Sequence, residues 1–364
     1  MNLLILSSHA ILEHDDLRMF SDLGYDTFIP GAYSDPHKPG AEFGSEPFRP
    51  AIPGAKAHPE LDALCHEQRV RHANESQLIP FGIIDWAKAD LHPDLIEWAD
   101  VIMVNCFVDT WIGGQWDRIK HKRVIWRTIG QSSPHLEVEM RTYARQGMEI
   151  VRYSPAEKRG FEPLGVFAGE DAMIRFCKYP SDYGPWIGDR IAVGNITQNL
   201  TERGDHCGLD FWEKATAWLP TAPAGLGSQR LPHGLGTLSF PDLLNYLRHI
   251  RAYLFMGTQP ASYTLSLMEA MLTGVPVVSI GPAAMWMPDL FEGHEMAGEW
   301  SNDPYEAAKT LRTFLYDKDA ATAVSEVQRH YAVNTFGIET VGPQWLRFLG
   351  SPARAEFHES VTAA

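Results

Sequence analysis

Short apolar runs alternate with longer stretches of mixed polarity along the first half of the chain. Five of the runs have the length and aliphatic content of buried strands, and two of the stretches between them have helical periodicity. The predicted strands are residues 3–7, 26–29, 101–105, 124–128 and 149–153, and the predicted helices are residues 15–23 and 135–146. Strands that alternate with helices in this way are typical of parallel α/β sheets.

The pattern is interrupted at residues 179–185, which contain two prolines and a glycine, and a new apolar strand begins at Ile191. A chain of 364 residues also exceeds what one hydrophobic core usually serves. We therefore expect two α/β domains. The expected parts are a first domain over residues 1–182, a second domain over 183–337, a helix over 338–350 and a disordered tail over 351–364.

Residues 252–280 contain the most informative pattern of the chain. Residues 252–256 are apolar and aromatic, as in a buried strand, and a helical pattern runs from about Thr264 to Leu272 after a polar loop. The unpaired backbone N–H groups and the positive end of the dipole at such a helix start suit a phosphate or diphosphate. The hydroxyls of Thr264 and Ser266 add hydrogen-bonding groups there. Gly274 ends the predicted helix.

Glu269 lies about one and a half turns into this predicted helix, among Leu267, Met268 and Met271. A carboxylate among apolar neighbours is unfavourable unless it has partners, and the paired hydroxyls of a ribose would supply them. The alternative interpretation is that Glu269 faces solvent or caps a neighbouring loop. These residues by themselves leave both interpretations open.

The same segment carries a motif with the residues Glu269-Ala270-Met271, Gly274 and Pro276-Val277-Val278. With it the chain resembles the retaining glycosyltransferases of family 4, which have the GT-B fold. The resemblance implies an α/β fold of two Rossmann-like domains that face each other across a central cleft, with residues 338–350 packing back on the first domain. It also implies that Glu269 binds the nucleotide ribose. The first acid of the family motif, which lies near the donor sugar, is replaced here by Ala261.

The resemblance also implies an activity. A sugar would move from a nucleoside-diphosphate sugar, the co-substrate, to a hydroxyl acceptor, with retention of configuration and without a metal or another cofactor. Fixed N–H donors at residues 264–267 would bind the charge of the leaving diphosphate.

Further positions at the predicted donor site follow from the resemblance. A loop that flanks the nucleotide base in the family aligns with Gly236 to Ser239, which includes Leu238. The family's diphosphate-binding arginine aligns with Asn195, so Arg203 and Lys214 are the next candidate cations, unless they are solvated surface charges. The predicted donor-binding residues are Glu269, Tyr263, Thr264, Leu265, Ser266, Arg203 and Leu238.

Acceptor chemistry is expected at the carboxyl ends of the strands in the first domain, where open α/β sheets bind ligands. His9 follows the first strand, and Arg127 and Gln131 follow the fourth. We predict these three as the catalytic residues and favour Gln131, because an amide both donates and accepts. The alternative is that Gly130 makes this loop an ordinary turn. Residues 30–59, rich in Pro and Gly, predict a long loop that shapes the acceptor cleft.

Composition limits the location and the metal chemistry of the protein. No apolar run approaches the about 20 residues of a membrane-spanning helix, and the N-terminus lacks the pattern of a signal peptide. We therefore expect no stable membrane insertion and a cytoplasmic location, in the host cytoplasm if the protein is viral. The cysteines are scattered, and His9, Glu13 and His14 have no established metal-binding spacing. We expect neither disulfides nor a metal site.

The net charge of the chain bears on the chemical class of the acceptor. The formal net charge of −15 disfavours an extended surface for nucleic-acid phosphates. A local basic rim on the first domain is still conceivable, built from Arg141, Arg145, Arg152, Lys158 and Arg159. The acceptor is therefore a glycan, a small molecule or, in a virus-type enzyme, a hydroxymethylated pyrimidine of DNA. Two alternatives are a phosphorolytic or epimerising enzyme and a non-catalytic nucleotide-sugar binder, which the alanine at position 261 keeps open.

Overall fold

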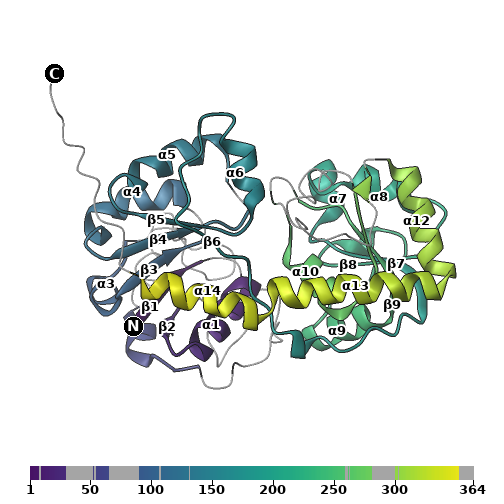
Figure 1. The fold of residues 1–364 in the computed structure, drawn as a ribbon, viewed down its shortest axis with the longest axis horizontal. Helices are drawn as coiled ribbons and strands as arrows, with labels where there is room; N and C mark the ends of the chain where they lie inside the picture. The colour runs from purple at the N-terminus through teal and green to yellow at the C-terminus, as the bar shows by residue number, and fades with distance from the viewer. Residues whose placement is uncertain are drawn as a thin grey trace. The chain divides into compact units, whose positions relative to one another are not determined.

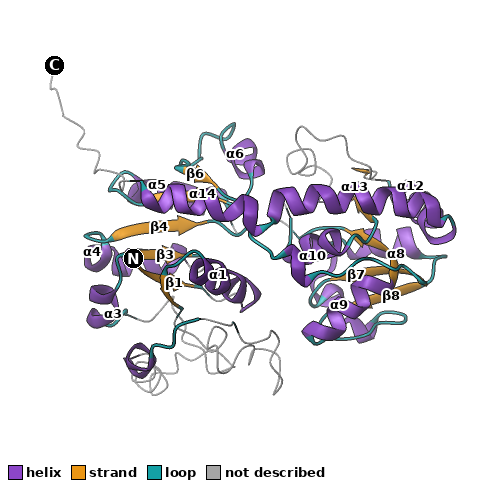
Figure 2. Ribbon diagram, turned by 60° about the horizontal axis from the view of Figure 1, so that its bottom comes forward, coloured by secondary structure: helices purple, strands orange, loops and turns teal. Residues whose placement is uncertain are grey.

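The computed structural model describes residues 1–7, 10–29, 52, 55–64, 90–105, 108–130, 132–258, 261, 263–280, 300–301 and 303–351. The chain folds into two compact units, each built on one parallel β-sheet flanked by helices (Figures 1 and 2). Unit 1 comprises Met1–Tyr153, Glu157–Ile174 and Gly342–Ala364, and unit 2 comprises Ser154–Ala156 and Arg175–Val341. The predicted α/β class is confirmed.

Unit 1 contains parallel strands in the order β2-β1-β3-β4-β5-β6. These strands are β1 (Asn2–Leu6), β2 (Asp26–Phe28), β3 (Val101–Val104), β4 (Arg123–Arg127), β5 (Glu149–Arg152) and β6 (Ala172–Met173). The strands predicted for this half are all present, with small differences at their ends. The sequence did not predict β6, because this strand at the sheet edge has only two residues, too few to form a recognisable apolar run.

Among the described residues, the helices of unit 1 include α1 (Ala10–Asp22), α3 (Pro93–Trp98), α4 (Val108–Ile119) and α5 (Pro134–Ala144), with most of α6 (Pro155–Phe161) and of α14 (Ile338–Gly350). Helix α1 starts earlier than the predicted residue 15, and its acidic residues Glu13 and Asp16 are buried rather than solvent-exposed. The core contains Leu4, Ile102 and Trp126 from the strands. Strands covered on both faces read as continuous apolar runs, which explains their prediction.

The C-terminal end of α14 is held in unit 1 by Arg123. The Arg123 Nη2 donates to the carbonyl of Phe348 at 2.9 Å, and Nη1 donates to the carbonyls of Leu349 at 2.9 Å and Ser351 at 3.0 Å. The Nε of the same guanidinium donates to Glu149 Oε2 at 2.6 Å. One partly buried arginine therefore donates to three carbonyls at the C-terminal end of the helix, and that of Phe348 also accepts from the Ser351 hydroxyl at 2.6 Å.

We expect Arg123→Ala to lower the free energy of unfolding by about 2 kcal/mol, because it leaves the Leu349 carbonyl and the Glu149 carboxylate without this donor. Urea unfolding followed by circular dichroism measures the change. The control is Lys120→Ala, which removes an exposed pair with Asp117 on the same unit and should change little. Equal losses in the two variants would contradict the anchoring role of Arg123.

Unit 2 contains parallel strands in the order β11-β10-β9-β7-β8. These strands are β7 (Arg190–Ile196), β8 (Thr221–Ala224), β9 (Ile250–Phe255), β10 (Val277–Ile280) and β11 (Trp300–Ser301). The new strand expected at Ile191 and the aromatic strand expected at residues 252–256 are both confirmed. Residues of β7, β9 and β10 such as Val193, Leu254 and Val278 form the core of this unit.

In the described part of unit 2, the helices are α7 (Leu200–Arg203), α8 (Leu209–Thr216), α9 (Phe240–His249), α10 (Leu265–Thr273), α12 (Pro304–Tyr316) and α13 (Lys318–Phe336). Single 3₁₀ turns lie at Pro180–Asp182, Gly204–Cys207 and Ser228–Arg230. Helix α12 packs on the core through Ala307, Leu311 and Phe314. This helix begins with Asp303, whose carboxylate accepts from the Tyr305 N–H at 2.8 Å.

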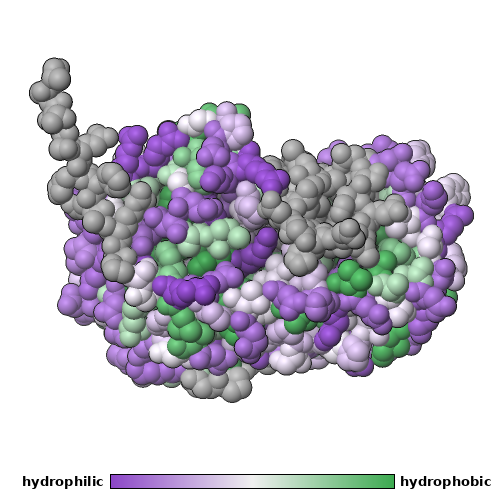
Figure 3. Space-filling model, viewed as in Figure 1, coloured by the Kyte–Doolittle hydropathy of each residue, from purple (hydrophilic) through white to green (hydrophobic). Residues whose placement is uncertain are grey.

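Among the residues that the structure describes, no helix has the length and apolar character needed to cross a bilayer. On the face shown in Figure 3, hydrophilic residues predominate and hydrophobic residues form small groups. The predicted loop at residues 30–59 and the predicted tail lie largely outside the described residues.

Candidate functional site

Helix α10 begins where the sequence predicted. Thr264 is its N-cap, and the Thr264 Oγ1 accepts from the Leu267 N–H at 3.4 Å. The helix ends at Gly274, whose φ of 92° lies in the left-handed region. A Cβ at Gly274 would come within 2.9 Å of the Ser325 hydroxyl, so both backbone and space require glycine here.

Hydroxyl groups join the start of α10 to the end of β7. The Ser266 Oγ donates to the carbonyl of Ile196 at 3.2 Å and lies 2.9 Å from Thr264 Oγ1. The Tyr253 hydroxyl of β9 accepts from the Ile196 N–H at 2.9 Å. Burial raises the pKa of Tyr253, so this hydroxyl stays protonated. The start of α10 therefore lies at the carboxyl ends of β7 and β9, where α/β sheets bind ligands.

The loops that follow β7 and β8 are held against each other. The Gln198 Oε1 accepts from the Leu226 N–H at 2.6 Å, and the Asn199 N–H donates to the Leu226 carbonyl at 2.6 Å. Gly225 has a φ of 112°, and a Cβ there would lie 2.6 Å from the Thr197 carbonyl. This close approach of two backbones requires glycine and fixes the rim of the site beside α10.

The remaining predicted donor residues come from other elements of unit 2. Leu238 is half-buried in the loop before α9, and Arg203 is exposed at the end of α7. Lys214 is exposed and paired with Asp210, as expected for a surface charge. A donor role for Leu238 and Arg203 stays a prediction.

Glu269 is buried in the middle of α10, with 2% of its surface exposed. Its Oε1 accepts from the Lys178 Nζ at 2.9 Å and from the Tyr183 hydroxyl at 3.4 Å. The interpretation that Glu269 faces solvent is therefore wrong. The sequence analysis missed both partners, which precede Glu269 by 91 and 86 residues. The signal available in the sequence was that Lys178 directly follows two apolar residues, Phe176 and Cys177.

Tyr263 and Leu265 direct their side chains into unit 2. Tyr263 is 1% exposed, its hydroxyl accepts from the Phe176 N–H at 3.3 Å, and its ring packs on Phe176 and Phe336. Leu265 is also buried. Leu265 offers a ligand its backbone N–H at the helix start. Tyr263 instead packs in the interior of unit 2 and stabilises the segment that precedes α10.

In unit 1, the structure places Arg127 inside the core. Its Nη1 donates to both carboxylate oxygens of Asp16 at 2.5 Å, and its guanidinium lies over the Trp345 ring. Asn105 donates to the same carboxylate at 3.4 Å. Burial raises the pKa of Asp16, and the Arg127 guanidinium works against that rise. An acceptor contact by Arg127 stays a prediction.

The two other predicted catalytic residues, His9 and Gln131, lie outside the described residues. Within the described part of the chain, no cluster of three or more His, Cys, Asp or Glu residues is placed to hold a metal ion. The basic rim proposed for the first domain is wrong at Arg152. This guanidinium is fully buried and pairs with Glu137 at 2.6 and 2.8 Å.

Glu157 is a buried acid that the sequence analysis did not single out. It lies in the first turn of α6, and its carboxylate accepts from the Thr128 hydroxyl at 2.5 Å and from the Ser132 hydroxyl at 3.1 Å. Burial raises the pKa of Glu157 to about 7. Its sequence signal was weak, because the acid stands in the charged stretch Glu157-Lys158-Arg159, which resembles a solvated helix face.

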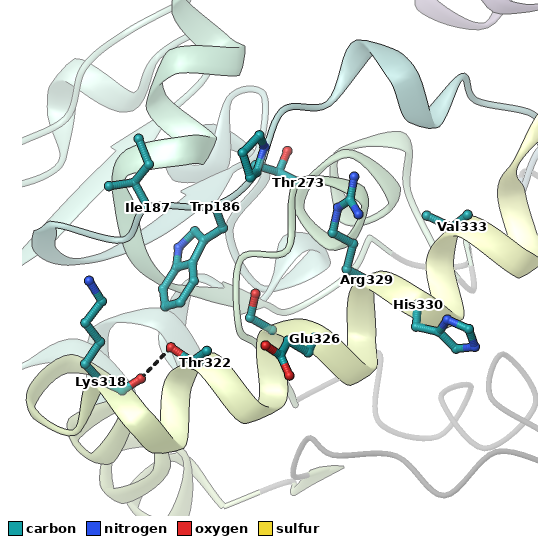
Figure 4. A pocket seen from close by; sticks show the side chains of 11 residues that line it. Trp186, Ile187, Thr273, Lys318, Thr322, Glu326, Arg329, His330 and Val333 are labelled. Atoms are coloured by element: carbon teal, nitrogen blue, oxygen red, sulfur yellow. Dashed lines mark hydrogen bonds between the residues drawn. The ribbon is translucent and has the colours of Figure 1, made fainter.

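A pocket of about 750 Å³ lies elsewhere on unit 2, between α13 and the segment before β7 (Figure 4). Trp186 and Ile187 form one side, and Thr322 and Arg329 of α13 form the other. The pocket includes Thr273, at the end of α10 opposite to Thr264. None of the predicted donor residues lines it, so it is separate from the candidate site.

Comparison with solved structures identifies the architecture. HepE from Anabaena, in complex with UDP-glucose, matches with a TM-score of 0.63 at 16% identity, over 97% of this chain and 100% of HepE. Sucrose-phosphate synthase from Thermosynechococcus elongatus matches with a TM-score of 0.64 at 12% identity, over 96% and 98%. A glycosyltransferase from Rickettsia africae matches with a TM-score of 0.60 at 11% identity, over 96% and 99%.

These likenesses show that the chain has the GT-B fold of two Rossmann-like units, as the sequence analysis predicted. At the level of sequence, neither a protein-family model nor a curated protein matches the chain.

Proposed function

We propose that this protein is a glycosyltransferase that moves a sugar from a nucleoside-diphosphate sugar to a hydroxyl acceptor. The observation that carries the proposal is the start of α10, where Thr264 and Ser266 stand at the carboxyl ends of β7 and β9. Its support is the GT-B fold shared with HepE, a protein in complex with UDP-glucose.

The diphosphate would bind at this helix start. The first N–H groups of a helix have no acceptor within it, and the helix dipole favours an anion there. Leu265 and Ser266 supply such N–H groups, and the hydroxyls of Thr264 and Ser266 lie beside them. Cleavage of the glycosidic bond builds negative charge on the leaving diphosphate, and fixed donors stabilise that charge without reorganisation.

Glu269 remains our proposed contact to the ribose. A carboxylate offers about four acceptor sites, so its ion pair with Lys178 is compatible with a further hydroxyl donor. The lysine also fixes the carboxylate, which would prepare it for a diol. The Tyr183 hydroxyl lies beside the same oxygen and limits the directions from which a ligand approaches.

The finer features of the proposed reaction come from the family resemblance. They are retention of configuration, independence of metals, and transfer of the acceptor proton to the departing diphosphate. The net charge of −15 and the burial of Arg152 favour a glycan or small molecule over DNA as the acceptor. A non-catalytic nucleotide-sugar binder is the second candidate, because Ala261 stands where the family has an acid.

The test is a thermal-shift and calorimetry screen with UDP, GDP, ADP and CDP and their glucose conjugates. We expect one base to raise Tm by about 5 °C at a ligand concentration of about 100 Kd. Ser266→Asp should weaken that binding by about tenfold or more, because it places a negative charge beside the diphosphate while suiting the helix start. Release of sugar or its transfer then separates an enzyme from a binder.

The matched control is Tyr305→Asp, which places the same charge in the first turn of α12, at an exposed residue. This variant should bind the nucleotide as the wild type does. The Tm of each variant without ligand reports whether it folds. Absence of a shift with every nucleotide, in a protein that melts cooperatively, would overturn the donor site.

A further inference from the structure

A single carboxylate holds both ends of the connection between β4 and α5. Thr128 directly follows β4, and Ser132 precedes the helix. Their hydroxyls donate to the two oxygens of Glu157, at 2.5 Å from Thr128 and 3.1 Å from Ser132. The Thr128 hydroxyl also accepts from the Tyr153 N–H at 3.2 Å, at the end of β5. The cluster therefore lies at the carboxyl edge of the unit 1 sheet, where ligands bind in this class of fold.

The charged groups around Glu157 do not neutralise it directly. Arg152 of β5 is the cation that acts on Glu157, but its guanidinium binds Glu137 of α5 bidentately. Glu137 adds a repulsive negative charge. On β4, Arg127 is paired with Asp16. Burial therefore dominates, and it raises the pKa of Glu157 to about 7 against the attraction of Arg152 and the two hydroxyls.

This arrangement has a cost in stability. The pKa of Glu157 is about 7 in the folded protein and near 4.5 in an unfolded chain, so folding favours the protonated form. The contribution of Glu157 to the free energy of unfolding is therefore present at low pH and is lost as the pH rises from about 4.5 to about 7. A buried acid that opposes folding at neutral pH, at the ligand-binding edge of a sheet, is typical of functional sites.

We infer that Glu157 is a positioning residue of the acceptor side, whose carboxylate orients the Thr128 and Ser132 hydroxyls and thereby holds the residue that follows β4 beside the residue that precedes the cap of α5. The ionised carboxylate accepts from both hydroxyls. After protonation it carries one O–H donor, and one of the two hydrogen bonds must reverse. The role in acceptor binding rests on the proposed function, while the positioning itself is a property of unit 1.

The positioning is tested by hydrogen–deuterium exchange of the peptide over residues 127–137, at pH 6 and pH 8 after correction for intrinsic rates. We expect the wild type to be protected about tenfold less at pH 8 than at pH 6, because opening that hydrates the ionised Glu157 carboxylate is favoured at pH 8. Glu157→Gln should show the same protection at both values. Its Tm should match the wild type at pH 5 and exceed it at pH 8, because the amide removes the buried charge. The matched control is Glu162→Gln, an exposed acid just after α6.

Kinetics with an acceptor complete the test. In Glu157→Gln the KM for the acceptor should rise and lose its pH dependence near 7, while the Kd for the nucleoside diphosphate stays unchanged. Equal exchange of the peptide in wild type and Glu157→Gln at both pH values overturns the inference, whatever the nucleotide screen shows. Absence of nucleotide binding overturns the proposed function instead, and the exchange data still decide the role of Glu157.

Discussion

Lys178→Met is expected to lower the free energy of unfolding by about 3–5 kcal/mol at pH 8. The side chains of Lys178 and Glu269 are 1% and 3% exposed, and their charges lie 2.9 Å apart. Methionine preserves the length of the side chain and removes the ammonium. The Glu269 carboxylate then keeps its charge in a site with little water, which is the origin of the loss. Chemical denaturation followed by tryptophan fluorescence measures it.

The pH dependence of this loss identifies its cause. A buried carboxyl without its cation takes up a proton as the pH falls, so the loss should be smaller at pH 5 than at pH 8. Adding Glu269→Gln to Lys178→Met should recover part of the stability, because both charges are then absent. The control is Lys214→Met, which breaks an exposed pair with Asp210. A pH-independent loss without recovery would contradict the ion-pair explanation.

The second large effect is expected for Asp16→Asn, which should lower the free energy of unfolding by about 3–5 kcal/mol. Arg127 is fully buried, and both oxygens of Asp16 accept from its Nη1. A guanidinium does not lose its proton in the accessible pH range, so the remaining charge has no route to neutralisation. The loss should therefore not shrink as the pH falls from 8 to 5.5, unlike that of Lys178→Met.

Asp22→Asn is the matched control, because it changes an exposed acid on the same helix, α1. The double variant Asp16→Asn with Arg127→Met should be more stable than Asp16→Asn, since it removes the unbalanced guanidinium. Denaturation curves at the two pH values decide the matter. Equal stability of Asp16→Asn and Asp22→Asn would mean that the buried pair is not an important contact of unit 1.

The nucleotide screen connects these stability measurements to function. If Lys178 prepares Glu269 for a ribose, Lys178→Met should weaken nucleotide binding under conditions where the variant is still folded. Asp16→Asn in unit 1 should leave that binding unchanged. Both variants are expected to lose a similar free energy of unfolding. The contrast in their nucleotide binding therefore separates a contribution to the donor site from a general loss of stability.

Local patterns were sufficient to predict the elements that carry the donor site. The strands of unit 1 and the aromatic strand β9 are buried on both faces and therefore appear as apolar runs. Helix α10 is defined by its cap at Thr264 and its stop at Gly274, which act through neighbouring backbone atoms. Such signals operate within a few residues, so they can be read from one sequence.

The sequence by itself determined the α/β class, the two sheets, the start of α10 and the acidic balance of the chain, because periodicity, capping and composition are local or additive. Only the tertiary structure decided the partners of the buried charges. Lys178 reaches Glu269, Asp16 reaches Arg127, and Thr128 reaches Glu157, over separations of 91, 111 and 29 residues. A polar side chain finds its partner through the folding of distant segments against one another, and the low dielectric of the core then makes that choice energetically decisive.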